Sequence, residues 1–450
     1  MQDHIKKAAD TADRKKWLLK NASVIREDGT VSERTDLWIE DGVIAKIVPT
    51  GTQVKMPPAS GPFEEIDCSR FFISCGLPNL HVHTAMNIFK GIAEDADSDE
   101  WFNKLIFPYE SRLTRNDVFL GTKLGIAEMI NNGVTVFADH YFFEDAVLDA
   151  VLECGIRADL APTLFGMAPD FDDRLSQVRS FIRDHRNDSD LVSFRAGPHA
   201  DYTCPPDAIG KIADFARDED LAVHLHVSEE AAQVKLARER YSMTPFAYLD
   251  RYGIFERPVL VAHGLWVEEE DLPYLKEDTI FAICAKTYEK LAMGAGGFFK
   301  LRDKIRYGFG TDGAASSNTL NVAEQARMFA LLGKFLADDA HELKTLQVWQ
   351  HLMSGHEAFP FGTGKLREGA PADLVIWDLN GPDTFPVYHP VTCILYSANS
   401  SHVRYTMADG RFLKFDGKLM IDIEELTAEA EEARQALIAR GPGKADVSYL

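Results

Sequence analysis

The chain has 450 residues, 46% of them hydrophobic, and carries a formal net charge of −22 at pH 7. This length predicts one large domain with a smaller one beside it. The acidity argues against nucleic acid or an anionic membrane surface as a partner, because both would repel a negatively charged protein.

The sequence also indicates a compartment. Residues 1–17 are charged throughout and lack the apolar centre of a signal peptide. No stretch approaches the roughly 18 uncharged apolar residues that a membrane-spanning helix needs. The six cysteines are scattered without a CxxC pair, which is typical of reduced thiols. We therefore expect a cytoplasmic protein.

Short strands and turns are predicted for residues 17–49. The run WLLKNASVI (17–25) is followed by REDG (26–29), and a second EDG (40–42) interrupts DLWIEDGVIAKIV. Asp-Gly pairs favour tight hairpins. We expect residues 1–70 to form one part of a small β domain.

Apolar, strand-like runs alternate with amphipathic helical stretches from residue 71 onward. Strands that alternate with helices run parallel, and eight of them predict a distorted, TIM-like (β/α)8 barrel over residues 71–363. The eight runs are 71–83, 133–143, 156–166, 191–200, 221–229, 258–265, 279–286 and 305–313.

The strand-and-turn pattern returns in residues 364–450, with runs such as ADLVIWDLNG and VRYTMADGRFLKF. A helix over 423–440 follows, with Gly441 just past its end. The simplest arrangement joins residues 1–70 and 364–450 into one β-sandwich domain beside the barrel.

Histidines and carboxylates gather where the barrel strands end. Functional residues of such barrels lie at the carboxyl ends of the strands, and six of the 14 histidines lie there. Imidazoles with one carboxylate form a site for a divalent transition metal, most often zinc. The strand-end residues are His81, His83, His199, His224, His226, Glu229, His263 and Asp312.

These motifs resemble the amidohydrolase superfamily, and within it the aminoheterocycle deaminases, a branch that includes methylthioadenosine/S-adenosylhomocysteine deaminases and s-triazine hydrolases. The similar segments are HVH (81–83), DEWFNKLIFPYE (99–110), GPHADYTC (197–204), HVSE (226–229), AHG (262–264), GTDGAASSN (310–318) and GKLREGAPADLVIWDL (364–379). The likeness covers nearly the whole chain. It implies a metal-dependent hydrolytic deaminase that acts on a small amino-substituted heterocycle such as a purine, nucleoside, pterin or pyrimidine. A homo-oligomer is implied by the family alone.

The resemblance also implies individual roles. The metal ligands would be His81, His83, His226 and Asp312. Glu229 would shuttle a proton, His263 would polarise the attacking water, and Asp312 would take the proton of that water. Glu110 and His199 would contact substrate. Apart from the resemblance, Trp101 is compatible with stacking on a flat ring and with packing in the core. Strand four carries no lysine that could bridge two metals, so one metal is expected, with Zn²⁺ preferred and Fe²⁺ as the alternative.

Several alternatives stay open. His224 and His226 share strand parity, and His226 is preferred as the ligand because the HxxE spacing belongs to it. His140 is equally compatible with substrate contact and with a structural role. The strand-seven segment 283–294 departs from the HNPxSNxKLxxG pattern of nucleoside deaminases, which leaves the heterocycle undecided.

Two other functions are compatible with these motifs. A related hydrolase that cleaves a cyclic amide or a C–Cl bond is the first alternative function, and a non-catalytic scaffold is the second. Arg157 begins a strand and is expected beneath the barrel in a pairing role, rather than in the site.

Overall fold

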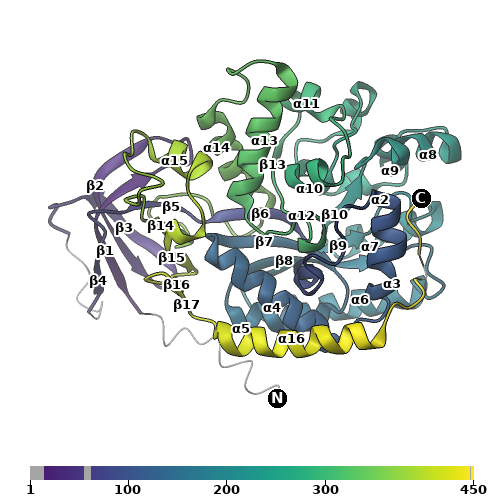
Figure 1. Ribbon diagram of the computed structural model, residues 1–450, viewed down its shortest axis with the longest axis horizontal. Helices are drawn as coiled ribbons and strands as arrows, with labels where there is room; N and C mark the ends of the chain where they lie inside the picture. The colour runs from purple at the N-terminus through teal and green to yellow at the C-terminus, as the bar shows by residue number, and fades with distance from the viewer. Residues whose placement is uncertain (1–14, 55–61, 446) are drawn as a thin grey trace.

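A computed structural model describes residues 15–54, 62–445 and 447–450. Most of the segment on which the signal-peptide expectation rests, residues 1–14, lies outside the described residues. Figure 1 shows two bodies side by side, a β-rich layer built from both ends of the chain and a barrel built from its middle.

The β-rich layer is one mixed, nine-stranded sheet with the order β17-β16-β15-β14-β5-β1-β2-β3, and β4 pairs with β1 outside this path. The predicted small β domain from the two chain ends is thereby confirmed. Its strands are β1 (Trp17–Ile25), β2 (Val31–Glu40), β3 (Val43–Pro49), β4 (Glu64–Asp67), β5 (Phe72–Cys75), β14 (Leu374–Trp377), β15 (Val403–Ala408), β16 (Arg411–Phe415) and β17 (Lys418–Leu419).

Both predicted hairpins form. Strand β1 pairs antiparallel with β2, and β2 pairs antiparallel with β3. Asp41 and Gly42 connect β2 to β3 with φ angles of 52° and 79°. Two positive φ values in a two-residue connection match the twist of the flanking strands, which is why Asp-Gly favours this turn.

The barrel consists of eight strands within the described ranges, in the order β13-β12-β11-β10-β9-β8-β7-β6. Neighbouring strands run parallel, as the alternation of runs and helices predicts. The first and last strands meet where the amides of Thr311 and Asp312 donate to the carbonyl of His81 at 2.9 and 3.0 Å. The strands are β6 (Leu77–Val82), β7 (Val134–Tyr141), β8 (Arg157–Leu164), β9 (Val192–Pro198), β10 (Ala222–Val227), β11 (Val259–His263), β12 (Ile280–Ile283) and β13 (Tyr307–Phe309).

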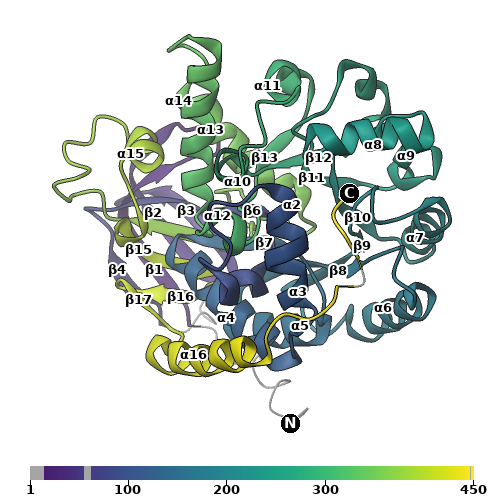
Figure 2. The ribbon, with the colours of Figure 1, turned by 45° about the vertical axis from the view of Figure 1, so that its right-hand side comes forward.

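Helices surround the barrel, and α16 lies along its lower edge in both views (Figures 1 and 2). The α-helices are α2 (Ser98–Glu100), α3 (Phe107–Glu110), α4 (Arg115–Asn131), α5 (Glu144–Cys154), α6 (Phe171–His185), α7 (Pro206–Asp218), α8 (Ala231–Tyr241), α9 (Pro245–Arg251), α10 (Ala285–Lys290), α11 (Phe298–Leu301), α12 (Ala314–Ser317), α13 (Val322–Ala337), α14 (Thr345–Ser354), α15 (Pro390–Tyr396) and α16 (Ile423–Arg440). The shorter helical turns are η2 (Thr84–Phe89), the π-helix η3 (Trp101–Ile106), η4 (Ile254–Glu256), η5 (Glu269–Tyr274), η6 (Arg302–Lys304), η7 (Gly355–Ala358) and η8 (Ser400–His402). Among the helices of the described ranges we find none with the length and hydrophobicity to cross a membrane.

The run 71–83, predicted as a single barrel strand, is two strands. β5 pairs with β1 and β14 in the terminal sheet, whereas β6 pairs with β7 in the barrel. The chain passes between the sheets at Gly76, whose amide donates to the carbonyl of Asp373 at 2.9 Å. A Cβ at position 76 would lie 2.0 Å from Oγ1 of Thr135, so this crossing admits only glycine.

Arg157 lies at the start of β8 and faces the terminal sheet. Its Nε donates to Asp373 at 3.0 Å, and its Nη2 donates to Asp409 at 2.9 Å. The side chain is 6% exposed. Arg157 is therefore paired beneath the barrel, away from the strand ends that carry the candidate site.

Candidate metal centre and surrounding pocket

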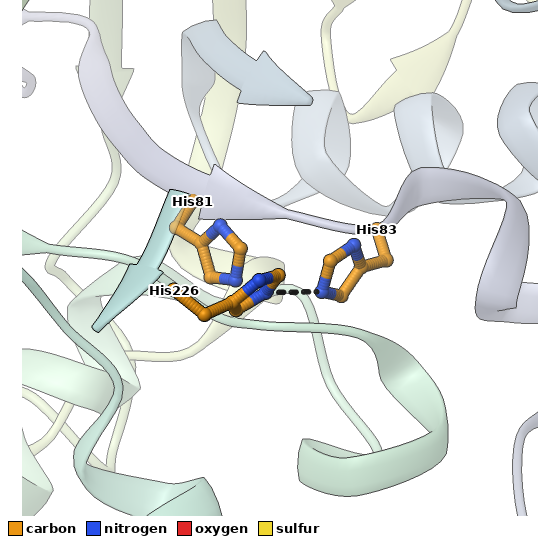
Figure 3. A group of neighbouring side chains, drawn as sticks. All are labelled: His81, His83 and His226. Atoms are coloured by element: carbon orange, nitrogen blue, oxygen red, sulfur yellow. Dashed lines mark hydrogen bonds between the residues drawn. The ribbon is translucent and has the colours of Figure 1, made fainter. Parts of the chain in front are cut away.

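Three imidazoles converge at the carboxyl end of the barrel. His81 lies on β6, His83 follows this strand directly, and His226 lies on β10 across the barrel. Residues two apart on a strand face the same side, so His81 and His83 both point at His226 (Figure 3). Ligand atoms of these three residues all lie within 4.8 Å of one another.

Backbone carbonyls orient two of these rings. Nδ1 of His83 lies 2.6 Å from the carbonyl oxygen of His140, and Nδ1 of His226 lies 2.7 Å from that of His199. A carbonyl only accepts, so each Nδ1 carries the proton and, in the neutral ring, each Nε2 keeps its lone pair. Those Nε2 atoms lie 3.3 Å apart. Two facing lone pairs repel, so this arrangement requires a proton or a cation between the rings.

Asp312 completes the centre from the end of β13. Its Oδ1 lies 3.6 Å from Nε2 of His81 and 3.3 Å from Nε2 of His83. Its Oδ2 accepts from Thr287 at 3.1 Å and from Ser316 at 2.6 Å. The φ of 57° places Asp312 in the left-handed region, a backbone strain that clusters at functional sites.

The residues present fit a divalent metal. Nε2 of His81 is buried and has no hydrogen-bond partner among the described residues. Burial lowers the pKa of His81 to about 4 and holds that of His226 well below the ordinary value, which leaves both rings neutral. Neutral imidazole nitrogens and a carboxylate are metal ligands, and three nitrogens with one oxygen suit zinc.

His224 lies one layer deeper, as expected for a supporting residue. Its Nε2 is 2.9 Å from Nδ1 of His81 and so holds the ring from behind. His140 combines two tasks, because it lines the pocket and its Nδ1 lies 2.9 Å from Oγ1 of Thr163.

Glu229 and His263 form a second pair beside the candidate ligands. Nε2 of His263 lies 3.3 Å from Oε1 of Glu229. Burial, followed by the negative charge of Asp312, raises the pKa of Glu229 well above its ordinary value. Burial lowers the pKa of His263 to about 3. Burial therefore favours the carboxylic acid form of Glu229 and the neutral form of the His263 imidazole.

A pocket opens above this centre. The lining of this pocket includes residues of the centre and of the neighbouring pair, namely His83, His226, Glu229, His263 and Asp312. The predicted substrate residues Trp101, Glu110 and His199 line it as well.

Hydrogen bonds fix two of the predicted substrate residues. Oε1 of Glu110 accepts from Tyr141 at 2.6 Å, and burial raises the pKa of Glu110. Nδ1 of His199 lies 3.0 Å from Oγ1 of Thr203.

Sequence reasoning did not single out most of the aromatic wall. These aromatic residues come from different loops, helices and strand ends and share no periodic signal, so only the pocket reveals them. The only cue for Tyr141 is its place next to His140 in the strand-end sequence DHYFF. The further lining residues are Met86, Phe102, Phe107, Tyr141, Phe142, Thr163, Phe165, Tyr202, Leu291 and Ser316.

The divergent strand-seven segment contributes both to the wall and to the centre. Leu291 lines the pocket, and Thr287 donates to Asp312 at 3.1 Å. The hydroxyl of Tyr288 accepts from the amide of Cys284 at 3.0 Å. The segment therefore positions Asp312 although it lacks the polar start of the nucleoside-deaminase pattern.

Comparisons with known proteins agree with this geometry. The Amidohydrolase family model matches residues 72–413. A 5-methylthioadenosine/S-adenosylhomocysteine deaminase of Dictyoglomus thermophilum is 37% identical over 371 residues, covering 81% of this chain and 87% of the relative. A 5'-deoxyadenosine deaminase of Methanosarcina mazei is 33% identical over 433 residues, covering 94% of this chain and 98% of the relative. A solved adenosine deaminase from Xanthomonas campestris with bound zinc has a TM-score of 0.87 at 27% identity, covering 94% of this chain and 98% of its own.

Proposed function

This chain belongs to the amidohydrolase family and is a hydrolase that acts on carbon–nitrogen bonds, and we propose that it releases ammonia from an amino-substituted nitrogen heterocycle by metal-dependent hydrolysis. The relatives named as deaminases support the reaction class. The side chains in the pocket support a separate role for each residue in this reaction.

The observation that carries the proposal is the pair formed by Glu229 and His263. Aromatic deamination needs a proton at the ring nitrogen while water adds to the carbon that bears the amino group. Burial and the nearby charge of Asp312 favour the protonated form of Glu229. Glu229 gives this proton to the ring nitrogen, so that negative charge does not build up there.

The other residues orient water and accept its proton. A divalent metal held by His81, His83, His226 and Asp312 would supply a water of lowered pKa. His263, whose Nε2 lies 3.3 Å from Oε1 of Glu229, would orient and polarise this water. Asp312 would accept one proton of this water and pass it to the amino group, which leaves as ammonia. The remaining hydroxyl proton would return to Glu229 as the carbon becomes a carbonyl.

We propose zinc as the metal, since the donor set suits it and the Xanthomonas campestris adenosine deaminase is described with bound zinc. We propose a cytoplasmic setting, since all six cysteines are buried free thiols.

Ammonia release across a panel of purines, nucleosides, pterins, pyrimidines and triazines tests the proposal. The metal-loaded protein is expected to release ammonia from at least one class, with stoichiometric formation of the carbonyl product. Chloride release from a chlorotriazine without any ammonia release would favour the alternative hydrolase.

A further inference from the structure

A segment that is distant in the sequence from the barrel strands reaches the candidate pocket. After α16 the chain runs beside α3 and ends next to α2 in both views (Figures 1 and 2). The amide of Gly443 donates to the carbonyl of Pro108 at 2.8 Å, which ties this segment to α3. The described residues 447–450 then lie against the loops at the carboxyl end of the barrel.

Tyr449 is the main contact of this segment. It is 3% exposed, and its ring stacks on Phe102 with centroids 4.6 Å apart and planes at 11°. Its ring also meets the ring of Tyr202 edge-on, with centroids 5.5 Å apart. Phe102 and Tyr202 both line the pocket, and Phe102 in turn contacts Trp101 at 4.7 Å.

Polar contacts fix Tyr449 on three sides. Its amide donates to Oδ1 of Asn103 at 2.8 Å, and its carbonyl accepts from Nδ2 of the same residue at 3.1 Å. Its hydroxyl donates to Oε2 of Glu230 at 2.6 Å, and the other oxygen of that carboxylate accepts from Ser98. Glu230 is the neighbour of Glu229, so Tyr449 joins the loop after β10 to the segment 98–110.

These aromatic residues form a cluster of their own. Phe107, Ala200, Tyr202 and Tyr449 are buried together, with Phe102, Leu236, Ala445 and Val447 packed against them, separately from the main core. A satellite cluster orders the loops that form it and adds little to the barrel itself. Its loss should therefore loosen the pocket wall locally.

We propose that Tyr449 is a positioning residue that holds the aromatic wall of the substrate pocket, through Phe102 on one side and Glu230 on the other. It touches no reacting atom. Its contribution is to keep Trp101, Phe107 and Glu110 over the pocket before substrate arrives, which lowers the entropy lost on binding. The expected effect on substrate binding rests on the proposed function, whereas the ordering of the wall does not.

The test compares Tyr449→Ala, Tyr449→Phe and the control Tyr388→Ala, a tyrosine that is 95% exposed. Tyr449→Ala removes the stacking and the bond to Glu230, so KM is expected to rise about tenfold, the equivalent of one lost contact, while kcat changes less than about threefold. Tyr449→Phe keeps the stacking and should raise KM about threefold. Tyr388→Ala should match the wild type.

Hydrogen–deuterium exchange supplies a readout that needs no substrate. Peptides from residues 98–110 are expected to exchange faster in Tyr449→Ala, with metal content and barrel peptides unchanged. If the wild type released no ammonia but this exchange increased, the proposed function would fail and the ordering role would stand. Unchanged exchange in 98–110, or a fall in kcat at constant KM, would overturn the positioning role. Because Tyr449→Phe preserves the packing, it keeps the test valid if Tyr449→Ala folds poorly.

Discussion

His83 and His226 face each other with their Nε2 atoms 3.3 Å apart, while a backbone carbonyl engages the Nδ1 of each ring. With both Nδ1 protons committed, the two rings cannot hydrogen-bond to each other while both are neutral. A cation between them resolves the conflict, and Asp312 supplies the compensating negative charge at 3.3 Å from His83.

The first prediction concerns metal content. The purified protein should bind about one divalent metal per chain through His81, His83, His226 and Asp312. His226→Ala should lower the metal content at least tenfold, measured by inductively coupled plasma mass spectrometry after dialysis, because a three-ligand remnant binds weakly. His341→Ala serves as the control, since residue 341 lies in a loop between α13 and α14. Two metals per chain bridged by a lysine would contradict the single-metal site.

The second prediction separates proton transfer from metal binding. Glu229→Gln removes the acid but not a proposed ligand, and the amide keeps the size of the side chain. Metal content should stay unchanged, and kcat should fall roughly 10²–10⁴-fold, the usual contribution of a positioned acid–base group. Loss of metal together with activity would show that Glu229 is a ligand instead.

The third prediction concerns the ion pairs beneath the barrel. Arg157→Ala leaves the buried carboxylate of Asp373 without its partner, which typically costs about 3–5 kcal/mol for a buried pair. The unfolding midpoint in urea should fall, whereas KM should change little, because Arg157 is not among the lining residues of the pocket. The exposed pair of Arg434 with Glu431 on α16 offers the matched control, since Arg434→Ala should leave the unfolding midpoint almost unchanged. A large rise in KM at unchanged stability would place Arg157 in the substrate site.

The fourth prediction concerns substrate charge. Among the described residues that line the pocket, none is lysine or arginine. Lys286 and Lys290 on the neighbouring α10 are already paired with Glu324 and Glu94. A phosphate would therefore enter without a partner and against a net charge of −22.

We accordingly expect kcat/KM to be higher for a free base or nucleoside than for the corresponding 5′-monophosphate, measured at one salt concentration. If the monophosphate were the best of the three, a cation outside this lining would have to reach the pocket, and the specificity argument would fail.

The fifth prediction concerns stability and pH. Asp201 is 1% exposed, and its Oδ1 has no hydrogen-bond partner among the described residues. Burial raises its pKa to about 7 from the ordinary 3.8. Between these two values the folded state holds a proton that the unfolded state has released, so the stability contributed by Asp201 is present below pH 4 and is lost as the pH rises through 7.

Asp201→Asn removes this titration. The stability of the variant relative to the wild type should therefore be greater at pH 8 than at pH 5. The gain should be about 1–3 kcal/mol, at 1.36 kcal/mol for each pKa unit, measured by urea unfolding of both proteins at both pH values. Asp303→Asn, whose side chain is 76% exposed, should show no such difference. An equal effect of Asp201→Asn at pH 5 and pH 8 would show that Asp201 is ionised in the folded protein throughout.

Local chemistry was enough to predict much of this architecture from the sequence. A strand exposes alternate residues to one face, so the spacing of His81 and His83 already placed two imidazoles together. Asp41 and Gly42 determined a hairpin because few residues tolerate two consecutive positive φ angles. The barrel followed from the alternation of apolar runs and helices, since parallel strands need a crossover between them.

Tertiary structure decided what depends on contacts between distant parts of the chain. His224 and His226 share parity, and only the depth of each in the barrel placed His226 against His83 and His224 behind His81. The run 71–83 divided at Gly76 because Asp373, far away in the sequence, binds its amide. Tyr449 likewise stacks on Phe102 only in the folded chain, because the two residues are far apart in the sequence. Such contacts arise from packing and loop closure, which neighbouring residues in the sequence do not encode, so the pocket wall became visible only in the folded chain.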